Sequence, residues 1–193
     1  VSYENYPFFV KHEMDINSPN VHDQETGIRI YHLNKLVEPT LTGNGIINDS
    51  LNFESKVPSW NINTNNLTDF KAISGRYAEK LTEFSSTFKL PLDELSLDST
   101  KSLYISVAAN TLIKEASSSM LVISIGDQES NYFWKGFNIE PFQRVYSNWW
   151  AVKQYTTLPV SSLKPNSSLS FYLWNKDKEE IWLDDMHILI YEY

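Results

Sequence analysis

The sequence contains no cysteine, which excludes disulfide bonds, thiolate metal sites and cysteine nucleophiles. Glycine is also scarce, with six residues in 193, and none of them belongs to a glycine-rich loop of the kind that cradles a phosphate group. The longest apolar runs, such as residues 120–123, are far shorter than the roughly 20 residues that a membrane helix needs. Thiol chemistry, nucleotide chemistry and a membrane span are therefore not predicted.

Positive charge is in short supply as well. The chain has 16 Lys and Arg residues against 24 Asp and Glu residues, which gives a net charge of -8. Its basic residues are scattered singly along the sequence instead of forming a stripe. Because a phosphate backbone is bound through clustered Lys and Arg side chains, a nucleic-acid partner is not predicted.

Catalytic motifs are also missing from the sequence. The four histidines, His12, His22, His32 and His187, do not form an HExxH pattern and have no close Cys or acidic neighbours at metal-ligand spacing. A G-x-S-x-G motif of a serine hydrolase does not occur either. We therefore predict that the chain is not an enzyme.

Aromatic residues are abundant, at 14% of the chain, and they favour β-strands. Alternation with period two is clearest at residues 103–107, where Leu103, Ile105 and Val107 share one face and Tyr104 and Ser106 share the other. The same analysis predicts strands at residues 75–81, 86–90, 120–125, 131–139, 149–157, 168–174 and 181–190.

Short polar turns separate these strands, which predicts an all-β chain that folds as an antiparallel β-sandwich of the jelly-roll type. Helix is expected only as single turns near residues 93–97 and 161–164.

Residues 48–193 are assigned to the sandwich. Residues 1–47 are assigned to an N-terminal extension or linker, in which residues 6–10 and 28–31 could form edge strands.

The last predicted strand contains an irregular step. Ile181 and Leu183 are two residues apart, but the next apolar residue, Met186, is three residues further on. If all three side chains face the core, one extra residue must be accommodated at Asp184-Asp185, which predicts a β-bulge. A bulge can turn a carboxylate inward. A buried carboxylate is costly unless it has a charge partner or several hydrogen-bond donors.

Several short motifs occur in a fixed order between residue 50 and the C-terminus. They are Leu51-Asn52-Phe53-Glu54, Trp60, Ser74-Gly75-Arg76-Tyr77, Phe84-Ser85-Ser86-Thr87-Phe88, Leu90-Pro91-Leu92, Trp149-Trp150, Leu158-Pro159, Phe171-Tyr172-Leu173-Trp174-Asn175 and Ile181-Trp182-Leu183-Asp184-Asp185-Met186. In this order they resemble the galactose-binding-like jelly-roll modules of the carbohydrate-binding-module type. The resemblance covers roughly residues 50–193.

The resemblance implies a structural calcium ion. In many such modules a Glu after the first-strand Phe and an Asp of the final Asp pair bind this ion, and the matching residues are Glu54 and Asp185, with Asp184 as the alternative. Calcium takes six to eight oxygen ligands, so backbone carbonyls would have to complete the site. The Asp184-Asp185 pair could also be catalytic, but adjacent residues of a strand point to opposite faces, which favours a structural role.

A ligand site, if present, is expected to use outward-facing aromatic residues. Tyr172 and Trp174 lie opposite Phe171 and Leu173 along one strand, and an aromatic ring offers an apolar face to the C–H groups of a sugar. We therefore predict that Tyr172, Trp174 and Trp134 bind the ligand, with Asn175 as a hydrogen-bonding side chain. The alternative is that these rings pack internally.

These observations favour a non-catalytic, extracytoplasmic module that binds a glycan and belongs to a larger cell-envelope or secreted protein. The chain begins with Val instead of Met, which is consistent with processing or excision from a longer polypeptide. The main alternative is a structural or protein-interaction domain of a membrane or surface protein with no sugar site. An unrecognised hydrolase is a third hypothesis, because a fold does not determine a function.

Overall fold

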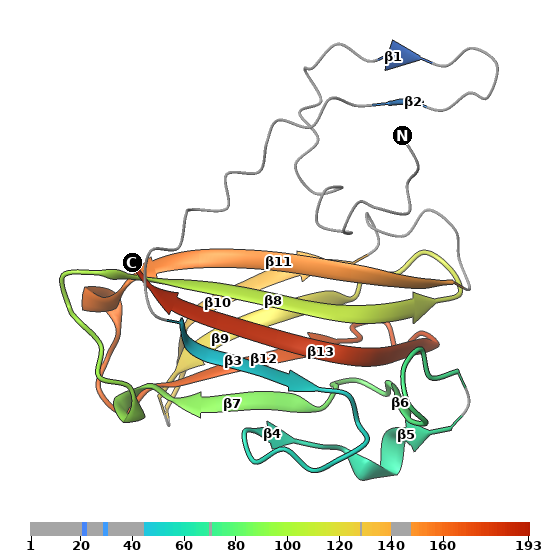
Figure 1. Cartoon of the computed structure of the whole chain (residues 1–193), viewed down its shortest axis with the longest axis horizontal. Coiled ribbons are helices and arrows are strands. Elements are labelled where there is room, and N and C mark those ends of the chain that lie inside the picture. The colour runs from blue at the N-terminus through green and yellow to red at the C-terminus, as the bar shows by residue number, and fades with distance from the viewer. Residues whose placement is uncertain (1–20, 23–28, 31–44, 70, 128, 140–147) are drawn as a thin grey trace.

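Two antiparallel β-sheets face each other in the computed structural model of the chain, which describes residues 21–22, 29–30, 45–69, 71–127, 129–139 and 148–193 (Figure 1). The five-stranded sheet has the order β10-β9-β12-β7-β4. Its strands are β4 (Trp60–Asn61), β7 (Thr87–Pro91), β9 (Met120–Gly126), β10 (Asn131–Asn138) and β12 (Ser168–Trp174).

The six-stranded sheet has the order β11-β8-β13-β6-β5, and β3 pairs with β13 beside this path. Figure 1 shows β11, β8, β13 and β3 lying side by side in this order. The strands are β3 (Gly45–Leu51), β5 (Leu67–Thr68), β6 (Ala78–Lys80), β8 (Ser102–Ile113), β11 (Trp149–Pro159) and β13 (Ile181–Glu192).

Outside the two sheets, the described residues contain short elements only. Strands β1 (Val21–His22) and β2 (Arg29–Ile30) pair with each other. Three single turns of 3₁₀ helix occur at η3 (Thr64–Asn66), η4 (Leu92–Glu94) and η6 (Val160–Ser162). None of the helices in the described part of the chain is long and apolar enough to cross a membrane.

The predicted fold class is confirmed, and each of the eight predicted strands is present. The sequence did not predict β3, β4 and β5 as strands. Strand β3 begins at Gly45, which pairs with Tyr191 of β13, and the division of the chain at residue 48 stays a prediction. The predicted edge strand at residues 28–31 contains β2, whereas the one at residues 6–10 lies outside the described residues.

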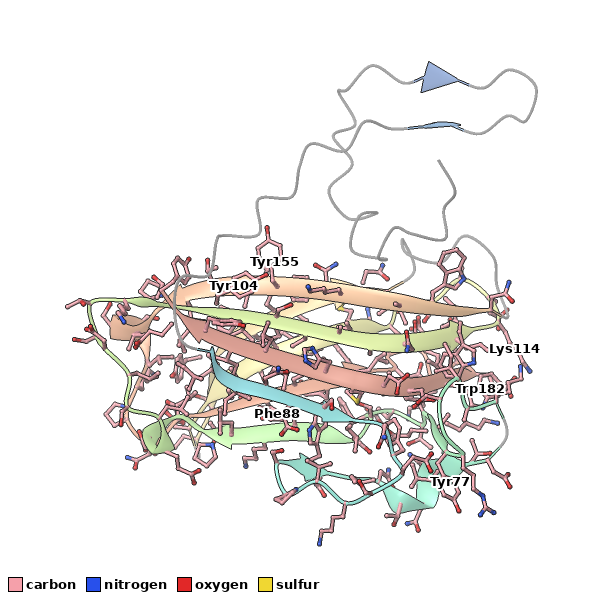
Figure 2. The ribbon with its side chains drawn as sticks, in the orientation of Figure 1. Tyr77, Phe88, Tyr104, Lys114, Tyr155 and Trp182 are labelled. Atoms are coloured by element: carbon pink, nitrogen blue, oxygen red, sulfur yellow. The ribbon has the colours of Figure 1, made fainter. Side chains whose placement is uncertain are left out.

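The predicted core lies between the two sheets. The completely buried side chains of the predicted strands include Leu103, Ile105, Val107, Leu121, Ile123, Phe171, Leu173, Leu183 and Ile188. Tyr104 and Ser106, on the opposite face of β8, are also buried, with 3% of each exposed. The Tyr104 ring stacks on Tyr155 of the adjacent strand β11, with 5.4 Å between the ring centroids, so the Tyr155 side chain covers Tyr104 on the outer face of the sheet (Figure 2).

The predicted bulge in β13 is confirmed. The register of β13 against β8 shifts between Asp184 and His187, and Asp185 has a positive φ of 47°. The left-handed conformation of Asp185 accommodates the extra residue. As a result, the five apolar side chains of the strand that face the core are completely buried: Ile181, Leu183, Met186, Ile188 and Ile190.

A buried carboxylate links the two sheets. Glu79 of β6 is fully buried, and both of its carboxylate oxygens accept a hydrogen bond from the Ser86 N–H (3.0 and 2.8 Å), one residue before β7. Burial raises the pKa of Glu79 to about 7, and the bonds from Ser86 oppose this rise only in part. The folded chain therefore keeps a proton on Glu79 at pH values where the unfolded chain has lost it.

We expect the free energy of unfolding to fall as the pH rises from about 4.5 to about 7, because the native state binds the Glu79 proton more tightly than the unfolded state. The difference between the two pKa values corresponds to about 3 kcal/mol. Urea unfolding of the native chain and of Glu79→Gln at pH 5 and pH 8 measures this effect. The variant should show a clearly smaller pH dependence, and the remaining part includes Asp184, whose pKa is also raised by burial. Glu94→Gln, which changes an exposed carboxylate, is the matched control. An unchanged pH dependence in Glu79→Gln would contradict the assignment.

Candidate functional site

Four aromatic side chains gather on the outer surface of the five-stranded sheet. They are Trp134 of β10, Tyr172 and Trp174 of β12, and Phe84, which precedes β7. We call these four residues the aromatic face. Trp134 and Phe84 are 48% and 47% exposed, and Tyr172 and Trp174 are half-buried. The rings are thus accessible from solvent and are not part of the core.

The strand pleat and the register bring three of these rings to one surface. In β12, Leu169, Phe171 and Leu173 are completely buried, so Tyr172 and Trp174 must point to the other side of the sheet. The sheet register aligns Tyr172 with Val122 of β9, and Trp134 of β10 with Ser124 of the same strand. The sequence prediction that Tyr172, Trp174 and Trp134 face outward agrees with this arrangement, and their binding of a ligand stays a prediction.

The four rings form a continuous series of contacts. Trp134 meets Trp174 edge to face, with 6.5 Å between centroids and 84° between ring planes. Trp174 stacks on Phe84 at 6.3 Å and 14°, and Phe84 meets Tyr172 edge to face at 5.8 Å and 72°. Such offset and edge-to-face pairs are the preferred aromatic geometries, so each ring is held in place by another.

Gly136 provides the space for the Trp134 indole. A Cβ atom on Gly136 would lie well inside the contact distance of the Trp134 ring and 2.8 Å from Met120 Sδ. The indole therefore lies directly against the backbone of β10, two residues along its own strand. The absence of a side chain at Gly136 determines where Trp134 can lie.

Phe84 belongs to the aromatic face, although the sequence did not predict it as a site residue. It forms a β-bridge with Trp174, next to the hydrogen bond from Ser85 N–H to Leu173 O (3.0 Å). Alternation from Phe88 backwards would place Phe84 inside, but Ser85 and Ser86 are both buried, so the alternation does not extend through this segment. The only sequence signal was an aromatic residue within a polar segment.

The prediction for Asn175 is wrong, because its side chain is fully buried. Its Nδ2 group donates to Thr82 O (3.0 Å) and Glu179 O (2.8 Å). Its Oδ1 atom accepts from Glu179 N–H (3.0 Å) and Ser119 Oγ (3.2 Å). Both ends of the amide are used to hold the turn after β12, so Asn175 stabilises the surroundings of the aromatic face and does not offer a group to a ligand.

The three carboxylates that the resemblance connected with calcium bind one loop, residues 73–77. Glu54 Oε1 accepts from Arg76 N–H (2.6 Å) and Tyr77 N–H (2.7 Å). Asp185 accepts from Ser74 Oγ (2.6 Å) and from Asn110 Nδ2 (3.1 Å). The two residues named as ligands therefore both hold the same loop.

Asp184 is the buried member of this group. Its Oδ2 atom accepts from Ile73 N–H (3.0 Å) and Ser74 N–H (3.2 Å), and its Oδ1 atom accepts from Asp185 N–H (2.8 Å). Burial raises the pKa of Asp184 to about 6 against the opposing effect of these N–H groups. Both oxygens of Asp184 are therefore bonded to N–H groups within the chain.

The side chains alone do not complete a calcium centre. The described residues contain no group of three or more His, Cys, Asp or Glu side chains that could hold a metal ion. N–H and O–H donors already point at the carboxylates of Glu54, Asp184 and Asp185, and calcium requires six to eight oxygen ligands. Calcium at Glu54 and Asp185 therefore stays a prediction, and backbone oxygens would have to supply most of the ligands.

Of the four histidines, His187 is the one whose side chain the structure describes. Its Nε2 atom is 2.8 Å from Asn48 Oδ1, and burial, with a further effect of the Lys153 charge, lowers its pKa. His12 and His32 lie outside the described residues, and the side chain of His22 does too.

Comparison with known proteins identified no matching family model and no matching curated protein. Among solved structures, the chain is similar to the CBM22-1 xylan-binding domain of Paenibacillus barcinonensis Xyn10C, with 18% identity over 77% of this chain and 96% of that one and a TM-score of 0.44. It is also similar to the C-terminal family 22 carbohydrate-binding module of Clostridium thermocellum Xyn10B, with 13% identity over 76% and 94% of the two chains and a TM-score of 0.42. At these identities the similarity concerns the β-sandwich fold alone.

Calcium binding can be tested by the melting temperature. A cation that binds only the folded chain stabilises it by mass action, so the calcium prediction expects a higher melting temperature in excess calcium than in EDTA. Glu54→Gln should remove this difference, whereas Glu94→Gln should keep it. Equal melting temperatures of the native chain in calcium and in EDTA would contradict the prediction and leave hydrogen bonding as the role of Glu54.

The role of Gly136 can be tested without a ligand. We expect Gly136→Ala to displace the Trp134 ring, because the added Cβ atom would overlap it, at a cost of about 1 kcal/mol. The edge-to-face pair of Trp134 and Trp174 should give a coupled far-ultraviolet circular dichroism signal from the two indoles. Gly136→Ala should weaken this signal as strongly as Trp134→Ala does, and an unchanged spectrum would show that the ring does not depend on Gly136.

Proposed function

We propose that the chain is a non-catalytic carbohydrate-binding module and that it binds a glycan on the aromatic face. The observation that carries this proposal is the contact series of Trp134, Trp174, Phe84 and Tyr172 on the solvent side of a sheet. Two of these rings are almost half exposed, although large apolar side chains are usually buried.

The chemistry of the rings suits a sugar. An indole or phenol ring presents an apolar face to the C–H groups of a pyranose, and its N–H or O–H group can bond a hydroxyl. The rings of this site stand on β10 and β12, and their mutual contacts restrict their motion. Binding to such a pre-arranged surface loses little conformational entropy.

The angle between the rings favours a single glycan chain as the ligand. Trp134 and Trp174 are nearly perpendicular, at 84°, so a flat crystalline surface cannot lie on the faces of both indoles. A free chain can turn between one sugar stacked on Trp134 and another stacked on the parallel pair of Trp174 and Phe84. We therefore propose soluble polysaccharide chains as the ligand class.

A non-catalytic role is supported by the positions of the two carboxylates whose pKa values are raised. Glu79 and Asp184, whose pKa values are raised, are buried and bonded to Ser86 and to the loop at residues 73–74. A glycosidase needs two carboxyl groups that flank the scissile bond in an accessible cleft. These two side chains do not have that arrangement.

The location of the protein belongs to the proposal as well. We propose that the module acts outside the cytoplasm as part of a longer cell-envelope or secreted protein, as the resemblance in the sequence implies. Detection of the protein by antibody in the secreted or envelope fraction of its source cells would support this location. Detection in the cytoplasmic fraction alone would contradict it.

The proposed function predicts that the purified chain binds soluble glycans on an array. Trp134→Ala and Trp174→Ala should each weaken the binding about tenfold or more, since a lost stacking contact of about 1.4 kcal/mol corresponds to a factor of ten. Both variants should stay folded, with about 1 kcal/mol of lost stability for Trp134→Ala, which breaks one aromatic pair, and about 2 kcal/mol for Trp174→Ala, which breaks two. Tyr155→Ala, which removes a partly exposed ring from the other sheet, is the matched control and should bind like the native chain.

A different outcome would favour the alternative function. If the folded chain binds no glycan on the array, the aromatic face is better explained as an interaction surface for another protein, because exposed apolar patches also mark such surfaces.

A further inference from the structure

The strands of the five-stranded sheet contain no Asp or Glu, although the chain has 24 acidic residues against 16 basic ones. Their only charged residues are Lys89 and Lys135. The strands of the other sheet, by contrast, include five acidic residues: Asp49, Glu79, Asp184, Asp185 and Glu192. The strands that carry the aromatic face therefore place no carboxylate where it would repel an anionic ligand.

One row of side chains crosses four strands of this sheet. Trp134 of β10 pairs with Ser124 of β9. Ser124 also pairs with Ser170 of β12, which pairs with Lys89 of β7. Paired residues point to the same side of a sheet, and the buried neighbours of Ser170 within β12 show that this is the solvent side. We call Ser124, Ser170 and Lys89 the polar row, which with Trp134 spans about 14 Å at the usual strand spacing.

Two hydroxyl groups of the polar row have no hydrogen-bond partner within the described part of the chain. Neither Ser124 nor Ser170 forms a side-chain hydrogen bond there, and neither oxygen is among the unpaired atoms that are sealed from solvent. Only 4% of Ser124 is exposed. A hydroxyl in so confined a position usually has a partner, so a polar group from outside the chain fits here.

The Trp134 indole leaves the polar row uncovered. The far edge of the ring lies over Gly136, two residues along β10, and the ring meets Trp174 of the aromatic face. The ring therefore extends along its own strand and not across the row towards Ser124. A sugar that stacks on Trp134 has the Ser124 hydroxyl group beside it.

Lys89 ends the polar row with an ammonium group that has no ion pair. Its side chain is exposed and forms no salt bridge with the described residues. Other lysines of the chain are paired with Glu side chains, namely Lys80, Lys101, Lys114 and Lys178. Because the strands beside Lys89 offer no carboxylate, an anionic group of a ligand fits this position, where its hydrogen bond would be charge-assisted.

We propose that the glycan bound by the aromatic face carries an anionic sugar, which binds at Lys89 after the chain has crossed the polar row. One sugar of the chain stacks on Trp134, and hydroxyl groups between this sugar and the anionic one bond to Ser124 and Ser170. This inference rests on the proposed function, because the sugar on Trp134 belongs to both. A uronate carboxylate and a sulfate ester would supply the same negative charge, and the probes below distinguish them.

The test is an NMR titration of the native chain with hexasaccharides of different charge. The anionic probes are hexagalacturonate, hexamannuronate and a κ-carrageenan hexasaccharide, which carries sulfate. The neutral probes are cellohexaose, xylohexaose and the methyl esters of the two uronates, which keep the same backbones. The indole N–H signals of Trp134 and Trp174 report on the aromatic face, and the backbone N–H signals of Ser124 and Ser170 and the Hε signals of Lys89 report on the polar row.

We expect an anionic probe to shift both sets of signals and to bind about tenfold more tightly than every neutral probe. Shifts caused by the uronates alone would identify a carboxylate as the anionic group, and shifts caused by the carrageenan alone would identify a sulfate ester.

The two sets of signals separate the two proposals. A neutral probe that binds at least as tightly as the anionic ones and shifts the indole signals alone would overturn the anionic ligand and leave the proposed function in place. Shifts of the polar row alone would support anion binding at Lys89 and overturn the aromatic site. If no probe shifts either set of signals, both proposals fail.

The contribution of Lys89 can be measured with a variant. Lys89→Gln should weaken binding of the anionic probe about tenfold, make it less sensitive to salt and leave the binding of neutral probes unchanged. Lys101→Gln makes the same change of charge just before β8 of the other sheet, and it should bind like the native chain. Equal affinity of the native chain and Lys89→Gln for the anionic probe would overturn the role of Lys89.

The Ser124 hydroxyl group gives a second measurement. Ser124→Ala should weaken binding about fivefold, which corresponds to the loss of one hydrogen bond. It should not lower the free energy of unfolding, because the hydroxyl has no partner in the free chain. Unchanged affinity, or a loss of stability in place of affinity, would overturn the role of Ser124 in binding.

Discussion

The burial of every second side chain of β12 is the constraint on which the aromatic face depends. Leu169, Phe171 and Leu173 are completely enclosed between the sheets, and a shift of the strand by one residue would exchange them with Ser170, Tyr172 and Trp174. The hydrophobic effect that holds β12 in place therefore also fixes the direction of its outward rings. The candidate site is as well determined as the core, because the same pleat produces both.

A similar dependence connects β13 with the loop at residues 73–77. The bulge lets β13 bury apolar side chains on both sides of Asp184 and Asp185. Asp184 then accepts from backbone N–H groups of the loop, and Asp185 accepts from the Ser74 hydroxyl group. Gly75 in this loop has a positive φ of 56°, and Glu54 lies so close that a Cβ atom on Gly75 would be 2.5 Å from its Oε1 atom. The shape of the loop is therefore determined by the three carboxylates that accept its hydrogen bonds and by Gly75, which leaves room for Glu54.

Features that depend on one strand could be predicted from the sequence, and features that depend on a partner segment could not. The alternation in residues 103–107 and the three-residue step before Met186 each reflect a single strand facing a core, and both predictions are confirmed. Phe84 and Asn175 show the limit. Their positions follow from the pairing of residues 83–85 with residues 173–175, and no local pattern reveals that pairing. The aromatic face could therefore be predicted only in part.

The small size of Gly136 has a consequence for how recognition by this surface could change. The Trp134 ring lies against bare backbone, so the height of the ring above the sheet depends on a residue that has no side chain with which to contact a ligand. A single added carbon atom would tilt or raise the indole while every recognition residue stayed the same. Ligand preference could then diverge between related chains through this neighbouring position, and a comparison of the aromatic residues alone would not detect the change.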